Sequence, residues 1–208
     1  MQAAPGTPLS PAAVGAGGPA RRRRVAVLAC VAAFVLAADI VSKALIVAHV
    51  RPDQPVHVLG DVLMLWLTRN PGAAFSVGTG KTVLFTVIAF GVIVYIARTA
   101  RTLYSVGWAI ALGLLLGGAM GNLGDRIFRA PGLFRGDVVD WIAVTRYYPI
   151  FNLADSAIVC GGILTVILAM RGNHLDGTRG DRPSGPAASA EADTEPAEPA
   201  ESAGSAEA

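Results

Sequence analysis

The chain has 208 residues, of which 53% are hydrophobic and only 15% are charged, and its formal net charge is +2. Soluble domains carry about a quarter charged residues, so this composition excludes an ordinary soluble protein, and we expect no nucleic-acid partner. Two cysteines are too few for a zinc cluster. We therefore predict an integral membrane protein with one compact membrane domain that uses no metal and no cofactor.

Both ends of the chain differ in composition from its middle. Residues 1–22 are rich in Ala, Gly and Pro, and residues 173–208 are rich in Ala, Pro, Ser and Glu. Neither segment can bury enough apolar surface to offset the entropy of ordering, so we predict two disordered tails. The membrane domain is then expected to comprise residues 23–172.

Four apolar segments approach the length of about 20 residues that a membrane helix needs. They cover residues 25–50, 82–97, about 103–120 and about 153–170, and the short second segment could borrow residues 75–77. Both cysteines, Cys30 and Cys160, stand in these apolar runs, so we expect small buried hydrophobic side chains rather than a disulfide.

Arginines indicate how the segments cross the membrane. The run at 21–24 precedes the first segment, Arg98 and Arg101 lie between the second and third, and Arg171 follows the fourth. Positive charge favours the cytoplasmic side, so both termini are predicted to be cytoplasmic, with residues 50–81 and 121–152 outside. The first outer segment contains "VHVLGDVLMLWLTRN", whose alternation predicts short strands. The expected fold class is an all-α membrane protein with four transmembrane helices and a small extracytoplasmic β-rich segment.

The start "RRRRVAVLAC" imitates a signal peptide that ends in a lipidated cysteine. However, the apolar stretch before Cys30 has only the five residues 25–29, whereas a signal core needs roughly 7–15. The apolar run also continues well beyond Cys30. We therefore expect an uncleaved membrane span rather than a signal peptide.

Ionisable residues inside membrane segments are rare and usually functional, and here they gather near one membrane face. Asp39 and Lys43 are four residues apart, on one face of the first helix. We interpret them as a structural ion pair, with direct catalysis as the alternative. "GGAMGNLGDR" places Asn122, Asp125 and Arg126 where the third segment reaches the interface. They form an interfacial turn, in which Asp and Arg satisfy each other, or a cluster that orients substrate or braces the site, and the two readings are compatible.

Three further motifs place polar residues at the same level. "NPGAAF" begins with Asn70 and reads as a turn before the second span. "VVDW" contains Asp140, which could be an ordinary loop aspartate paired with Arg135 or Arg146. In "FNLAD", Asn152 and Asp155 have the spacing of a helix N-cap and its third residue, which predicts a capping box.

Two carboxyl groups held close together can hydrolyse a peptide bond, because one keeps a proton while the other acts as a base. Asp140 and Asp155 are the candidates for this pair, and the helix dipole favours the ionised form of Asp155. Other chemistries fit less well. Adjacent Ser42 and Lys43 point apart on a helix, the three histidines lack metalloprotease spacing, and the presenilin-type Gly-x-Gly-Asp motif is not met.

Taken in chain order, these motifs resemble the bacterial lipoprotein signal peptidase family (signal peptidase II), whose members are aspartic peptidases of the inner membrane. The resemblance covers about residues 25–171 and is carried by "DIVSK", "NPGAAF", "GGAMGNLGDR", "VVDW" and "FNLAD". It implies that Asp140 and Asp155 are the catalytic pair. The family's other polar positions fall on Asp39, Lys43, Asn70, Asn122, Asp125, Arg126 and Asn152.

The resemblance also implies a substrate and a place. The substrate is a prolipoprotein whose cysteine carries diacylglycerol, the cut lies just before that cysteine, and the active site is at the outer membrane face. We expect a monomer whose partners are lipidated prolipoproteins and membrane lipids. Two alternatives remain, which are a small transporter or proton carrier that uses membrane carboxylates, and a non-catalytic assembly factor whose polar groups hold helices together.

Overall fold

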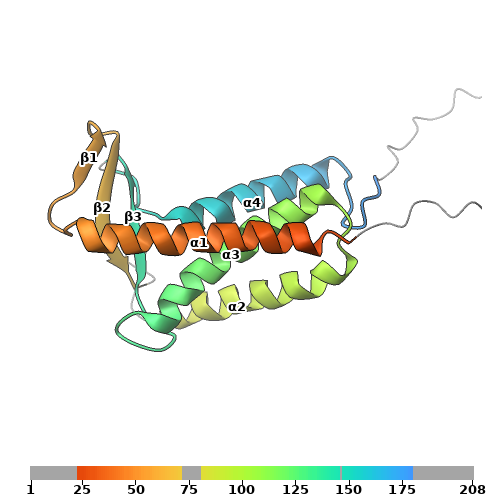
Figure 1. The fold of residues 1–208 in the computed structure, drawn as a ribbon, viewed down its shortest axis with the longest axis horizontal. Helices are drawn as coiled ribbons and strands as arrows, with labels where there is room; N and C mark the ends of the chain where they lie inside the picture. Colours follow the sequence, from red (N-terminus) through yellow and green to blue (C-terminus); the bar gives the residue numbers. More distant parts are fainter. Residues whose placement is uncertain (1–22, 72–80, 146, 180–208) are drawn as a thin grey trace, which may run out of the picture.

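The computed structural model describes residues 23–71, 81–145 and 147–179. Within them, four helices are long and apolar enough to cross a membrane, and three strands form a small sheet at one end (Figure 1). The helices are α1 (Val25–His49), α2 (Lys81–Thr99), α3 (Val106–Phe128) and α4 (Leu153–Met170), with a short 3₁₀ helix η1 (Ala100–Thr102) after α2. The strands are β1 (Val56–Leu59), β2 (Leu63–Asn70) and β3 (Val138–Val144). The predicted fold class is confirmed.

Helix α3 differs most from its predicted bounds. It begins at Val106, where the side chain of Ser105 caps the helix by accepting from the amide of Trp108, and it continues to Phe128. Residues 121–128 were expected to lie in an outer segment, yet they form the last two turns of the helix. Asn122 and Asp125 in these turns contact the buried Lys43 of α1, so they need no water. The proposed contribution of residues 75–77 to the second span lies outside the described residues.

Glycines on α3 allow its neighbours to approach closely. A Cβ atom at Gly117 would lie 2.7 Å from Cβ of Val35 on α1, and one at Gly118 would lie 2.5 Å from the carbonyl oxygen of Ala154 on α4. Small residues at such contacts are typical of membrane helix packing, because apolar burial drives little association in lipid. Helix α3 therefore lies against both α1 and α4.

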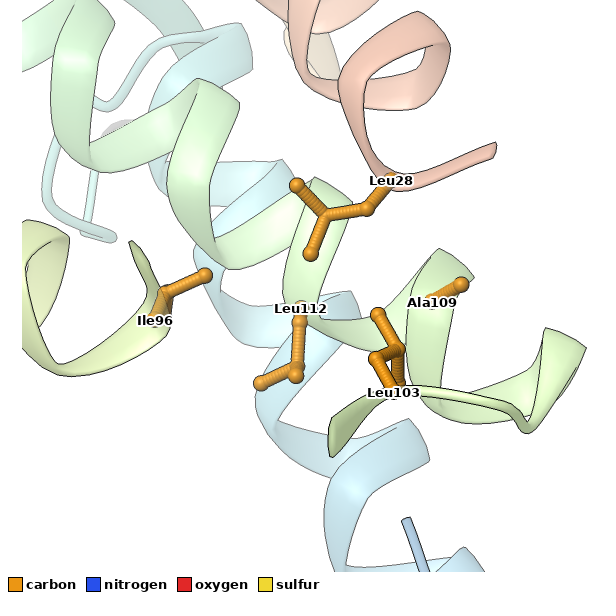
Figure 2. Close-up of a cluster of buried hydrophobic side chains, with 5 residues drawn as sticks. All are labelled: Leu28, Ile96, Leu103, Ala109 and Leu112. Carbon is orange, nitrogen blue, oxygen red and sulfur yellow. The ribbon is translucent and has the colours of Figure 1, made fainter. Parts of the chain in front are cut away.

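At the end of the bundle opposite the sheet, an apolar cluster joins three helices. Figure 2 shows its members, which come from α1, α2, the connection after η1 and α3: Leu28, Ile96, Leu103, Ala109 and Leu112. Leu103 is fully buried, and its carbonyl oxygen accepts a 2.9 Å hydrogen bond from the amide of Arg24. This cluster fixes the end at which both chain termini emerge (Figure 1).

The chain after α4 stays packed against this cluster for longer than its composition predicts. Residues 173–179 form a tight turn closed by a bridge between Asn173 and Arg179. Its Leu175 packs on the apolar cluster and accepts from the amide of Tyr104 at 2.9 Å, and the indole of Trp108 donates to the carbonyl of Asn173 at 2.9 Å. The chain thus stays packed against the bundle beyond the predicted domain boundary at residue 172, as far as residue 179.

Both cysteines are free and exposed, so the expectation that they are buried is wrong. Cys30 lies on α1 and Cys160 on α4, where apolar side chains point out of the bundle. In a membrane domain the surroundings are themselves apolar, so an apolar sequence does not indicate burial within the protein.

The sheet confirms the strands predicted from "VHVLGDVLMLWLTRN" and adds a third. The strand order is β1-β2-β3, antiparallel throughout, and Thr68 of β2 lies opposite Asp140 of β3. Its inner face rests on the end of α1 through a cluster of Ile46, Val50, Leu67 and Val139. This contact holds the sheet, whose strand β3 contains Asp140, against the end of the helical bundle (Figure 1).

Candidate active site

The first turn of α4 contains the predicted capping box. The side chain of Asn152 accepts from the amide of Asp155 at 2.9 Å, and the Asp155 carboxylate accepts from the amide of Asn152 at 3.2 Å. Asn152 is completely buried. One oxygen of Asp155 is thus fixed by the backbone of its own helix, and the orientation of the carboxylate follows.

Asp140 lies on β3 with an exposed fraction of only 2%. Its carboxylate accepts from Nδ2 of Asn152 at 2.7 Å and from Nδ2 of Asn70 at 3.0 Å. Among the described residues its hydrogen-bond partners are therefore asparagines and not Arg135, while Arg146 lies outside the description. Asn70, expected to belong to an ordinary turn, ends β2 and holds the aspartate of the neighbouring strand.

Two asparagine side chains connect the two aspartates. Nδ2 of Asn122 donates to Asp155 at 2.7 Å, and Nδ2 of Asn152 donates both to Asp140 and, at 3.2 Å, to Oδ1 of Asn122. Each of the four carboxylate oxygens thus accepts an N–H group. The carboxyl groups are linked through these amides, and no direct hydrogen bond joins them in the part of the chain that the structure describes.

Burial, together with the charge of nearby Asp155, raises the pKa of Asp140 from 3.8 to about 6, against the opposing effect of the hydrogen bonds from Asn70 and Asn152. A carboxyl group with this pKa binds a proton far more readily than a surface aspartate. Because Asp155 contributes to the shift, the two groups influence each other electrostatically, as a shared proton requires.

The buried Lys43 contacts residues next to the pair of Asp140 and Asp155. Nζ of Lys43 lies 2.7 Å from Asp39, 2.9 Å from Asp125 and 3.2 Å from the side-chain oxygen of Asn122. Asp39 in turn accepts from the amide of Ala154 at 3.0 Å, which ties α1 to the start of α4. The predicted ion pair between Asp39 and Lys43 is therefore present, and its contacts are those of a structural brace.

Asp125 and Arg126 do not satisfy each other as an interfacial turn would require. Asp125 pairs with Lys43 and Arg129 and also accepts from the amide of Val139 at 3.2 Å. The guanidinium of Arg126 instead lies 5.8 Å from the ring centroid of Phe85 on α2. Its Nη1 is buried and has no hydrogen-bond partner among the described residues.

Two cavities lie next to the aspartate pair. One of about 310 Å³ lies between α2, α3 and α4; its wall is mostly apolar, with Asn122, Arg126 and Asp155 as its polar residues. The other, of about 260 Å³, lies against the sheet and is lined by Asn70 and Asp140 together with Thr68, Arg69, Pro71, Pro149 and Ile150. Each aspartate therefore faces a different cavity.

Some residues of the site escaped the sequence analysis. Arg129 pairs with Asp125, and the spacing of four on one helix could have indicated this. Gly121 lies against the Asp39 carboxylate, where a Cβ atom would approach Oδ2 to 2.5 Å, and its spacing of four from Gly117 was the available signal. Phe85 carried no signal in the sequence. In the described ranges no three His, Cys, Asp or Glu side chains are grouped to hold a metal ion.

Comparisons with known proteins agree with this geometry. The family model described as Signal peptidase (SPase) II matches residues 31–171. Curated relatives named lipoprotein signal peptidase include one from Streptomyces coelicolor, 60% identical over 76% of each chain. Another, from Mycobacterium tuberculosis, is 51% identical over 76% of this chain and 78% of its own.

The fold also matches a solved structure, described as a bacterial membrane enzyme determined by the in meso method at 1.9 Å resolution. The TM-score is 0.64 at 28% identity, covering 73% of this chain and 97% of the other. Sequence and fold thus agree over the whole helical domain and favour a peptidase over the transporter considered above. The chain belongs to the signal peptidase II family.

Proposed function

We propose that this protein removes signal peptides from diacylglyceryl-modified prolipoproteins by an aspartic mechanism, with Asp140 and Asp155 as the catalytic residues. One observation supports this most strongly. Two carboxyl groups from consecutive elements, β3 and α4, are both held by Asn152, and each lines a different cavity, one apolar and one more polar. A peptide that leaves the membrane as an apolar helix and continues as an extended segment fits this arrangement.

In the proposed reaction Asp140 carries the proton and Asp155 is ionised. The raised pKa of Asp140 favours this assignment, as does the position of Asp155 in the first turn of a helix. Asp155 takes a proton from a water molecule whose oxygen attacks the scissile carbonyl carbon, while Asp140 protonates the carbonyl oxygen. When the intermediate collapses, Asp155 gives its proton to the leaving amine of the lipidated cysteine, and the hydroxyl proton returns to Asp140. The products are a signal peptide with a free carboxyl end and a lipoprotein with a free amine.

Arg126 is proposed to bind the substrate. Its Nη1 is buried without a partner in the described residues, and the side chain lines the apolar cavity together with Asp155. A peptide carbonyl oxygen that enters the cavity would supply the missing acceptor, and the positive charge would stabilise the developing oxyanion. Asn70, Asn122 and Asn152 position the carboxyl groups, and the brace of Asp39, Lys43 and Asp125 positions the asparagines.

The membrane orientation is also part of the proposal. Exposed arginines, among them Arg24, Arg98, Arg101 and Arg171, lie on elements that meet at the end away from the sheet. The positive-inside bias puts this end, and with it both termini, in the cytoplasm, so the aspartate pair lies at the outer face. One copy of the chain contains every residue assigned to the site, so we propose that it acts as a monomer.

The decisive experiment replaces each carboxyl group by its neutral isostere. Asp140→Asn and Asp155→Asn are expected to insert normally and to lower the turnover of a lipidated precursor at least a thousandfold, since neither can exchange the proton. Asp53→Asn, at an exposed turn far along the chain from both aspartates, is the matched control and should process normally. Mass spectrometry of the membrane fraction separates precursor from product. Normal processing by either site variant would exclude the aspartic mechanism.

A further inference from the structure

The connection between α3 and β3 combines a rigid backbone with large exposed apolar side chains. Gly136 donates its amide to the carbonyl of Arg126 at 3.0 Å, and Asp137 donates to the carbonyl of Ala130 at 2.9 Å. A Cβ atom at Gly136 would lie 2.7 Å from the carbonyl oxygen of Arg129, so the chain passes directly beneath the helix end. The loop is therefore held in one shape.

This fixed shape presents its apolar residues outward. Phe128, Leu133 and Phe134, which we call the apolar edge, have exposed fractions of 86%, 67% and 47%. The segment from Ile127 to Gly136 contains no acidic residue, and exposed Arg135 adds a positive charge. Apolar and aromatic side chains beside arginine are the composition of segments that lie in the headgroup and acyl boundary of a bilayer.

The apolar edge continues the surface that α2 turns toward lipid. The hydroxyl of Thr86 on α2 donates to the carbonyl of Phe134 at 3.3 Å, which joins the loop to the first turns of that helix. Val83, Leu84 and Val87 in these turns are 47%, 53% and 62% exposed. In Figure 1 the loop lies at the sheet end of the bundle, next to the start of α2. The apolar side chains of α2 and the loop thus form one lipid-facing surface at the membrane boundary.

The loop also stands beside the mouth of the apolar cavity. Phe85, adjacent to Thr86, lines that cavity, as does Arg126, whose carbonyl accepts from Gly136. We infer that the apolar edge inserts into the outer-leaflet interface and anchors the cavity mouth at the depth where the acylated cysteine of the substrate lies. This inference rests on the proposed function for the identity of the substrate, while the insertion itself does not depend on cleavage.

Insertion can be measured without any reaction. Leu133→Cys, in a background of Cys30→Ala and Cys160→Ala, is labelled with the fluorophore NBD and placed one copy per nanodisc. We expect a blue-shifted emission that is quenched by lipids carrying a doxyl group near the headgroup. The same label at Asp53→Cys, in the exposed turn before β1, should emit as in water. Water-like emission at position 133 would overturn the inference. Emission that turns blue only when two copies share a disc would also overturn it, in favour of a dimer contact.

The effect on the reaction separates anchoring from a structural role. In liposomes Phe128→Gln combined with Leu133→Gln should raise KM for a lipidated precursor about tenfold and leave kcat unchanged. Phe128→Leu with Leu133→Met keeps the edge apolar and should retain the original KM. An equal fall of kcat in both double variants would contradict the inference. Asp155→Asn with the label at Leu133→Cys should still show insertion, so failure of the proposed mechanism and failure of the anchor are distinguishable.

Discussion

Asp140→Asn is predicted to make the folded protein more stable at neutral pH while it removes activity. Asp140 is 2% exposed, and burial raises its pKa from 3.8 to about 6. Because the folded state binds this proton more tightly than the unfolded state, the contribution of Asp140 to stability is fully present below pH 4. It is lost as pH rises through about 6. The difference of about two pH units corresponds to about 3 kcal/mol, which the ionised form costs above pH 6.

Asp140→Asn avoids the cost of burying an ionised carboxyl group but introduces a smaller cost in hydrogen bonding. An asparagine oxygen can still accept from Asn152, whose own orientation is fixed by the capping box, whereas the new NH₂ group faces the NH₂ group of Asn70. We therefore expect a net gain of about 1–2 kcal/mol at pH 8, below the full 3 kcal/mol, and no gain at pH 4.

The assay is reversible unfolding in mixed micelles, followed by tryptophan fluorescence as the denaturing detergent is increased, at pH 4 and pH 8. Asp53→Asn makes the same chemical change at an exposed turn and should not alter the midpoint at either pH. If Asp140→Asn had the same effect on the midpoint at pH 8 as at pH 4, the pKa of Asp140 would be the same in the folded and unfolded states. The assignment of the proton to Asp140 would then lose its basis.

Two further predictions concern the scaffold. Lys43→Met should cost about 3–5 kcal/mol in the same unfolding assay, because it leaves the carboxylate of Asp39 buried without its cation and leaves Asp125 with Arg129 alone. Adding Asp39→Asn should recover part of this loss, and a double variant no more stable than the single one would refute the pairing. A chain that ends at Arg179 should unfold like the full chain, whereas one that ends at Gly172 should lose about 2 kcal/mol with the packing of Leu175 and the hydrogen bond from Trp108. The composition of residues 173–208 predicts a disordered tail, so a chain that ends at Gly172 would be expected to keep its full stability. Equal stability of the two truncated chains would support that prediction.

Features of the site that depend on local sequence were predictable. The capping box needs only Asn152 and Asp155 three residues apart, and the Asp39–Lys43 pair needs only helical spacing. Both follow from the geometry of a single helix. That Asp140 would meet Asp155 followed instead from the motif resemblance and the expectation of a common membrane level. The chain between them gives no geometric reason for it.

What could not be predicted depends on contacts between distant elements. The sequence predicts that the third span ends at Asn122, Asp125 and Arg126, because polar residues are costly in lipid. They continue α3 because Lys43 of α1 meets two of them and an aromatic ring of α2 covers the third. The composition of residues 173–179 likewise predicts a disordered tail, because it does not show that the indole of Trp108 donates a hydrogen bond to this segment.

The charges around the site favour the binding of a proton by one of its carboxyl groups. Five aspartates, at positions 39, 125, 137, 140 and 155, lie around three cations, Lys43, Arg126 and Arg129, so the fully ionised cluster has an excess of negative charge. In a region of low dielectric such an excess is costly, and binding a proton reduces it. Asp39 and Asp125 contact Lys43 directly, and Asp155 lies in the first turn of a helix. The described hydrogen-bond partners of Asp140 are neutral side-chain amides, and burial raises its pKa to about 6, so we assign the proton to Asp140. The brace that fixes the helices would thereby also favour the protonation state that the proposed aspartic mechanism requires.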